Sequence, residues 1–149
     1  MKFDQFEPGQ TITAGPYEVT ESEIIEFARQ YDPQWFHTDP AKASDSRFGG
    51  LIASGWHTCG IAMRLAVEAA LDSSESFASP GLEYIKWPAP VYPGDRLRLS
   101  ATVLETRRAS KSPWLGILRW RWHLHNQDGV EVLELEATSL FDLGTEPAT

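Results

Sequence analysis

Residues 54–71 read SGWHTCGIAMRLAVEAAL, and this stretch decides the fold of the chain. Its only charged residues are Arg64 and Glu68. A helix that is apolar on nearly all sides is usually buried, so we predict a buried central helix over residues 55–71. Small side chains along it would let other elements approach closely: Gly60, Ala62, Ala66, Ala69 and Ala70.

The second half of the chain alternates between apolar and polar residues, which is typical of half-buried strands. The sequence Asn126-Gln127-Asp128-Gly129 is a hairpin-turn signal. Residues 72–81 are rich in serine and are expected to form a loop. The expected strands cover residues 82–87, 97–103, 118–125 and 132–141.

The two faces of the last hairpin differ in character. Trp120 and Trp122 share one face and are expected to pack on the central helix. Val132, Glu134 and Glu136 are expected on the opposite, polar face of the last strand. There the two glutamates would face Arg119 and Arg121, and each cross-strand pair would contribute roughly 0.2–1 kcal/mol.

These patterns together predict the fold class. One buried helix followed by an antiparallel meander gives an α+β fold, in which the sheet wraps around the long helix. This is the hotdog arrangement. Neither half of the chain could bury its apolar face alone, so residues 1–149 are expected to form a single domain.

The first half of the chain is expected to carry a helix over residues 20–31. Thr20 and Glu23 make a capping box at its start, and Asp32-Pro33 discourages further helix. Asp39-Pro40 resembles an N-cap followed by proline, which would open a short helix near residues 41–44. The segment between these helices is therefore expected to be a loop.

That loop carries the chemistry of the chain. Asp32 and His37 supply a carboxylate and an imidazole, and Ser54-Gly55 opens the central helix. These groups can move a proton or activate a water beside a polarised carbonyl. The alternative is a loop aspartate and a surface histidine with no catalytic role. Nearby large side chains are candidates for the substrate pocket: Trp35, Phe36, Trp56 and His57.

The overall composition excludes several classes of function. The net charge is −8 and the pI about 4.9, which disfavours binding to nucleic acid or to an anionic membrane. The single cysteine, Cys59, fits a reducing compartment and is expected to be buried. Because no signal peptide and no long apolar run is evident, we expect a cytoplasmic protein.

The remaining histidines do not predict a metal site. His57 falls in the first turn of the central helix, where a neutral structural histidine is expected. His123 and His125 lie on the polar face of a strand beside two arginines. Because the histidines lack the helical i, i+4 spacing and no Cys/His cluster exists, no metal is expected.

Three segments resemble the MaoC-like dehydratase family, which contains the R-specific enoyl-CoA hydratases. They are residues 32–39, 48–58 and 82–95, and they follow one another in the expected order. Asp32 and His37 match the acid and the histidine of the family's Asp-x-Asn-Pro-x-His motif.

The resemblance also assigns a role to the start of the central helix. Gly55 matches the glycine whose N–H helps to bind the thioester oxygen. Ser54 stands where the family has a histidine, and the resemblance implies that it helps Gly55 to bind the thioester. Gln34-Trp35 replaces the family's Asn-Pro.

The resemblance implies reversible hydration of an enoyl thioester. Coenzyme A would enter as part of the substrate, with no separate cofactor, and an acyl carrier protein is the other possible carrier. Two alternatives stay open on the same fold: a non-catalytic acyl-thioester-binding module, and a thioesterase. The thioesterase would need an acid from the central helix, where Glu68 is the only one. A homodimer is expected, because a half-wrapped sheet leaves an edge and a face to cover.

Overall fold

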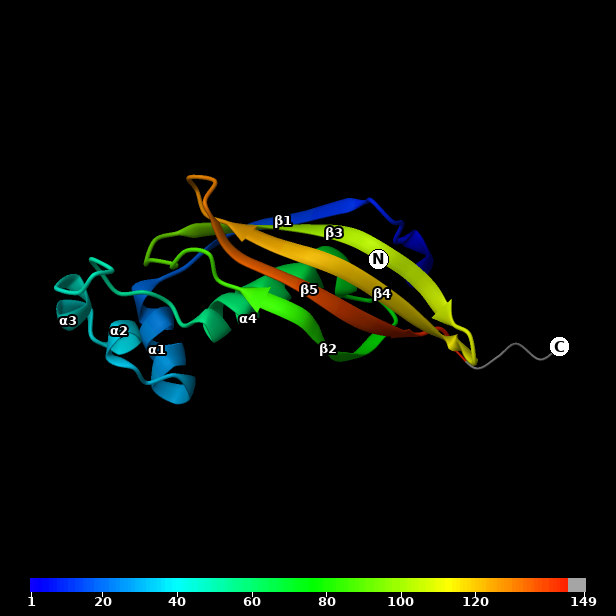
Figure 1. Ribbon diagram of the computed structural model, residues 1–149, viewed down its shortest axis with the longest axis horizontal. Helices are drawn as coiled ribbons and strands as arrows, with labels where there is room; N and C mark the ends of the chain where they lie inside the picture. The colour runs from blue at the N-terminus through cyan, green and yellow to red at the C-terminus, as the bar shows by residue number, and fades with distance from the viewer. Residues whose placement is uncertain (145–149) are drawn as a thin grey trace.

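A computed structural model describes residues 1–144, which form a five-stranded antiparallel sheet curved around one central helix (Figure 1). The strand order is β1-β3-β4-β5-β2. The predicted α+β architecture is confirmed, whereas residues 145–149 of the expected domain lie outside the described residues. The strands are β1 (Thr11–Glu18), β2 (Ser76–Lys86), β3 (Arg96–Ala109), β4 (Ser112–His125) and β5 (Glu131–Asp142).

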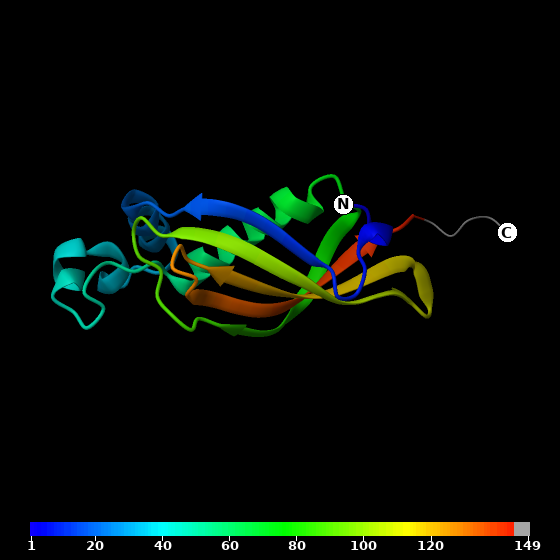
Figure 2. The same ribbon diagram turned by 90° about the horizontal axis from the view of Figure 1, so that it is seen from above.

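The central helix is α4 (Gly55–Ala66), which continues as a π-helix, η2 (Val67–Leu71). Figure 2 shows it lying along one face of the sheet. No helix among residues 1–144 is long and apolar enough to cross a membrane. The buried residues of α4 follow the spacing of one helix face: His57, Thr58, Ile61, Ala62, Leu65 and Ala66.

The opposite face of α4 is exposed, so the prediction of a helix buried on all sides is wrong for this face. Trp56 is 59% exposed, Met63 45% and Val67 37%. The physical reason is that one sheet covers only one side of a helix. The apolar residues of the other side therefore remain open to solvent in the isolated chain.

The inner face of the sheet forms the core with α4. Trp120 is completely buried and packs edge-on against Trp122, with ring centroids 5.2 Å apart. The indole N–H of Trp120 donates to Ser139 Oγ at 3.2 Å, which satisfies the buried donor. The prediction that both tryptophans face the core is confirmed.

The outer face of the sheet carries ion pairs, and the prediction that Glu136 faces Arg119 and Arg121 is confirmed. Glu136 accepts from Arg119 at 3.1 Å and from Arg121 at 3.4 Å. Glu134 instead lies beside His123. Val132 was expected on this face but is completely buried, because the register with β4 shifts there and makes it the extra residue of a bulge.

The strand predictions require correction at four places. No strand was predicted for β1, which pairs with β3 and is interrupted between Ala14 and Tyr17. Residues 72–81 were predicted to form a loop, whereas β2 begins at Ser76 and pairs with β5. The strands β3 and β4 extend beyond the predicted ranges 97–103 and 118–125, because their hairpin continues to Ala109 and Ser112. Serine, proline and glycine are typical of loops, but β2 is an edge strand, where these residues are tolerated.

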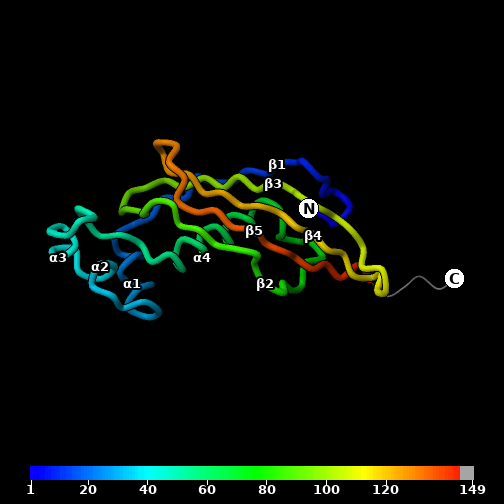
Figure 3. Tube along the Cα trace, in the orientation of Figure 1, coloured from blue at the N-terminus to red at the C-terminus, as the bar shows by residue number. Residues whose placement is uncertain are grey.

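A helical segment between β1 and α4 lies at one end of the sheet and positions the candidate site (Figures 1 and 3). It holds α1 (Glu21–Tyr31), α2 (Trp35–Thr38) and α3 (Pro40–Ser44). The predicted capping box is confirmed, since Thr20 Oγ1 accepts from the Glu23 N–H at 3.2 Å. The N-cap of α3 is also confirmed, but the expected loop holds a one-turn helix, α2.

Candidate active site

Asp32 and His37 contact each other, as their spacing predicted. Asp32 is the C-cap residue of α1, and His37 lies on α2. His37 Nε2 is 3.2 Å from Asp32 Oδ2, and the two side chains are only 6% and 16% exposed, respectively. The turn between the two short helices therefore brings a carboxylate and an imidazole together in a largely buried setting.

The other ring nitrogen of His37 fixes the tautomer. Nδ1 lies 2.7 Å from the carbonyl oxygen of Ile52. A carbonyl oxygen only accepts hydrogen bonds, so Nδ1 must carry a proton and donate it. Nε2 is then the nitrogen that faces Asp32, and a proton on Nε2 would complete a hydrogen bond to the carboxylate.

Two neutral donors hold the Asp32 carboxylate. The amide of Gln34 donates to Oδ1 at 2.7 Å, and the hydroxyl of Ser54 donates to Oδ2 at 2.8 Å. Burial on its own would raise the pKa of Asp32, but these hydrogen bonds and the charge of His37 outweigh it and lower the pKa. Asp32 is therefore a carboxylate at neutral pH.

The start of α4 lies beside this pair. Ser54 caps the helix, since its Oγ accepts from the Trp56 N–H at 3.3 Å. The Gly55 N–H has no backbone acceptor within the described part of the chain. It stands at the positive end of the helix dipole, where a developing negative charge would be stabilised.

Gly55 is also required by packing. The Trp87 indole N–H donates to the Gly55 carbonyl at 3.0 Å. A Cβ added at Gly55 would lie 2.6 Å from Cε2 of the same indole ring. Only glycine lets Trp87 lie this close to the first turn of α4.

Asp32, His37 and Gly55 line one cavity of about 380 Å³. Asp32 and His37 are its only ionisable lining residues among those that the structure describes. A mainly apolar cavity with a few polar groups is the usual form of a small-molecule site. The other lining residues are Phe48, Ile52, Ala53, Trp56, Thr58, Trp87, Pro88, Ala89, Pro90 and Val91.

Of the four residues proposed for the pocket, Trp56 lines the cavity and the other three do not. Trp35 is partly exposed, with the Lys42 ammonium 4.8 Å from its ring centroid. Phe36 packs edge-on against His37, with ring centroids 4.4 Å apart, and so restricts the orientation of the imidazole ring.

His57 does not line this cavity and packs against α1. It stacks on Phe27 with ring centroids 4.9 Å apart, and its Nε2 is 3.8 Å from Glu23. Burial lowers the pKa of His57, although the Glu23 charge opposes this shift. A neutral structural histidine, the alternative given above, is the description that fits these contacts.

One wall of the cavity was not predicted from the sequence. Residues 87–91 join β2 to β3 and pass beside the start of α4. The proline at every second position, Pro88 and Pro90, was taken only as a break between strands. Trp87 was predicted to end a strand, whereas β2 ends at Lys86 and the indole lies against the start of α4. The available signal was this large side chain directly before a proline, where a strand cannot continue regularly.

A second cavity, of about 580 Å³, lies between the exposed face of α4 and the edge strand β2. Its walls include Met63, Phe77 and Leu82, and it is largely apolar. Cys59 is another lining residue and is half-buried, not buried as expected. Burial raises the pKa of its thiol, so the thiol stays protonated at neutral pH.

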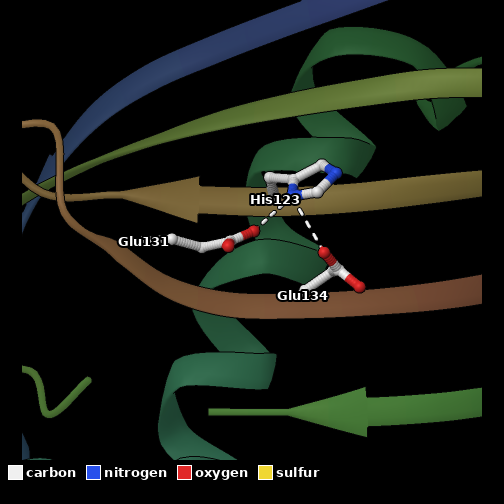
Figure 4. A group of neighbouring side chains, drawn as sticks. All are labelled: His123, Glu131 and Glu134. Atoms are coloured by element: carbon white, nitrogen blue, oxygen red, sulfur yellow. Dashed lines mark hydrogen bonds and ion pairs between the residues drawn. The ribbon is translucent and has the colours of Figure 1, made fainter. Parts of the chain in front are cut away.

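Figure 4 shows a third group, on the outer face of the sheet. His123 contacts Glu131, and its Nδ1 is 3.6 Å from Glu134. The three donor atoms lie within 4.8 Å of one another, a spacing compatible with a metal ion. A hydrogen bond from Tyr84 lowers the pKa of Glu134, so this residue is a carboxylate at neutral pH. The direct contacts of His123 with the two glutamates hold the group together.

The chain resembles proteins of one family along most of its length. The family model described as "MaoC like domain" matches residues 4–113. The uncharacterized protein YdeM of Bacillus subtilis is 36% identical over 140 residues, which are 94% of this chain and 98% of YdeM. The 3-hydroxyacyl-thioester dehydratase Z of Mycobacterium tuberculosis is 33% identical over 88 residues, or 58% of each chain.

The fold is also found in solved structures. The crystal structure of the MaoC-like dehydratase from Rhodospirillum rubrum superposes with a TM-score of 0.87 and 34% identity. The match covers 95% of this chain and 97% of the Rhodospirillum chain.

Proposed function

Because the chain belongs to the MaoC-like domain family, we propose that it catalyses the reversible hydration of a 2-enoyl thioester to the 3-hydroxyacyl thioester. One observation carries this proposal. A charged carboxylate and an imidazole meet in a mainly apolar cavity, beside a helix N-terminus whose Gly55 N–H has no backbone acceptor among residues 1–144. These are the groups that water addition to a polarised double bond requires.

In the proposed mechanism, Asp32 and His37 hold one water molecule over C3 of the substrate. Asp32 accepts a proton from the water as its oxygen bonds to C3. The electrons of the double bond move towards the thioester and form an enolate. The proton is then returned through the Asp32–His37 pair to C2, so the net change is the addition of one water. Dehydration follows the same path in reverse.

The Gly55 N–H would stabilise the negative charge that develops on the thioester oxygen. Removing one such donor typically lowers the rate by a factor of roughly 10²–10³. The apolar walls would accept the acyl chain and exclude bulk water, which strengthens these electrostatic interactions. Coenzyme A or an acyl carrier would remain attached through the thioester, and no further cofactor is required.

The test follows the absorbance of the conjugated enoyl thioester with a panel of enoyl-CoAs. The wild type should consume the enoyl band, and product chirality would test the R-specific assignment. Asp32→Asn and His37→Ala should each lower the rate by roughly 10²–10⁴. Full activity in both variants would contradict the proposal.

The Glu68→Gln variant serves as a matched control and also addresses the thioesterase alternative. Glu68 pairs with Arg64 at 3.0 Å on the exposed side of the helix and does not line the cavity. The Glu68→Gln variant should therefore hydrate enoyl-CoA at the wild-type rate. Release of free thiol without hydration would support a thioesterase. Binding of the thioester without turnover would support a non-catalytic module.

A further inference from the structure

We propose that Ser54 and Gln34 are positioning residues, which fix the orientation and the negative charge of the Asp32 carboxylate. This inference rests on the proposed function, because it concerns the base of the hydration reaction. Three groups meet the carboxylate: Gln34 at Oδ1, and Ser54 and His37 at Oδ2. Of these, His37 takes part in the chemistry, and the other two are neutral donors.

Ser54 restrains the Asp32 carboxylate more strongly than Gln34 does, because the Ser54 hydroxyl is completely buried and has one possible orientation. Its Oγ accepts from the Trp56 N–H at 3.3 Å, which occupies a lone pair. Its single proton points to Asp32 Oδ2 at 2.8 Å. The residue therefore joins the carboxylate to the first turn of α4, which also presents the Gly55 N–H. One side chain thus fixes the position of the Asp32 carboxylate relative to the Gly55 N–H.

Gln34 restrains the carboxylate less strongly, although its hydrogen bond to Asp32 is shorter than that of Ser54. The amide lies 2.7 Å from Asp32 Oδ1, but the side chain is exposed to solvent. Water can replace an exposed donor, whereas it cannot easily replace a buried one. We therefore expect loss of the Ser54 hydroxyl to have a larger effect than loss of the Gln34 amide.

The surroundings of Asp32 provide no substitute for these donors. His37 on α2 is the one other titratable group that lines the cavity among the described residues. The segment that faces it from between β2 and β3, residues 87–91, carries no charge. Loss of the Ser54 hydroxyl should therefore leave Asp32 both less acidic and less well oriented.

The first experiment measures kcat and KM against pH for enoyl-CoA hydration in Ser54→Ala. We expect kcat to fall about ten- to a hundredfold, with KM changed less than about threefold. The midpoint of the acid limb should move up by about half a pH unit to one unit. Gln34→Leu should shift it in the same direction by less, and Ser54→Thr, which keeps the hydroxyl, should restore the wild-type midpoint.

Loss of the helix cap must be separated from loss of the contact to Asp32. Thr20→Ala removes an equivalent cap from α1, where Thr20 Oγ1 accepts from the Glu23 N–H, and it leaves the cavity intact. It should lower thermal stability without moving the pH midpoint. An unshifted midpoint in folded Ser54→Ala, or the same shift in Thr20→Ala, would overturn the proposal.

A measurement without substrate distinguishes this inference from the proposed function. The carboxyl ¹³C resonance of Asp32 can be titrated by NMR in the wild type and in Ser54→Ala. A midpoint that rises in the variant supports the positioning role even if no thioester is hydrated. Equal midpoints in the two proteins would refute that role even if hydration is observed.

Discussion

At the scale of single residues, the candidate site depends on side chains that satisfy two demands at once. Ser54 caps a helix and holds a carboxylate. Gly55 offers an N–H and makes room for an indole ring. His37 donates to a carbonyl with one nitrogen and faces Asp32 with the other. Substitution at any of these positions should therefore disturb both stability and chemistry.

Gly55→Ala provides the clearest case. Its new methyl group would lie 2.6 Å from the Trp87 ring, so one of the two must move. Overpacking of this kind costs about 1–3 kcal/mol of unfolding free energy, and the hydration rate should fall as well. The test compares the unfolding free energies, measured with urea, of Gly55→Ala, Trp87→Leu and the double variant. Additive losses would contradict a direct clash, because the double variant should recover part of the stability.

His57 should contribute to the pH dependence of stability. Burial lowers its pKa below that of the unfolded chain, which is about 6.5. The neutral ring thus contributes stability that is present above about pH 6.5 and is lost as the pH falls towards the folded-state pKa. The wild type should lose more unfolding free energy between about pH 7 and 5 than His57→Gln. Equal losses measured by denaturant titration would count against this account.

At the residue scale, the sequence predicted which ionisable side chains meet better than it predicted the cavity walls. Asp32 and His37 were identified because a motif spacing places them together. Ser54 was assigned to the thioester, but the structure shows that its hydroxyl bonds to Asp32. The wall at residues 87–91 was missed because it approaches the site through tertiary packing alone, and the spacing of residues along one segment carries no information about such contacts.

At the scale of elements, local signals predicted the starts of α1 and α3 but not the one-turn helix α2. The alternation of apolar and polar residues predicted the central strands. The Thr20–Glu23 capping box and the Asp39 cap fixed two helix starts correctly. The alternation of Trp120 and Trp122 with arginines oriented β4 correctly. The strand that was missed, β1, and the strand whose start was predicted as a loop, β2, are the two edge strands. The central strands β3 and β4 were found, but both extend beyond their predicted ranges at the hairpin that joins them. Edge strands tolerate glycine, proline and serine, so their composition resembles that of loops.

The central strand β4 allows a comparison of two tryptophans on one element. Trp120 is completely buried, whereas Trp114 is 40% exposed. Trp120→Ala should lower the unfolding free energy by about 3–5 kcal/mol. Trp114→Ala, the matched control, should have a much smaller effect. Similar losses in thermal or chemical unfolding would show that the hydrophobic core is not centred on the inner face of β4.

At the scale of the whole molecule, we propose that a second copy of this chain covers the exposed face of α4 and the edge of β2. Apolar side chains gather there around the larger cavity, including Met63, Phe77 and Leu82. Exposed apolar patches of this kind mark association sites. The free edge of β2 also presents unpaired backbone groups that another strand could use.

Sedimentation or gel filtration of charged variants tests this arrangement. Met63→Glu and Leu82→Glu place charges on the exposed face and should convert a dimer into a monomer. Val130→Glu is a matched control, because Val130 is similarly exposed but precedes β5 in the hairpin turn. A monomeric wild type, or dissociation by Val130→Glu alone, would contradict the proposed surface.

The two halves of the cavity come from separate parts of the chain, and this has a consequence for divergence. The proton-handling pair lies on the segment between β1 and α4, whereas the wall at residues 87–91 belongs to the connection between β2 and β3. Insertions or substitutions in that connection can reshape the space for the acyl chain without moving a proton donor or acceptor. If the chain has the proposed function, a change of substrate therefore requires no change in the reaction, and the two properties can evolve independently.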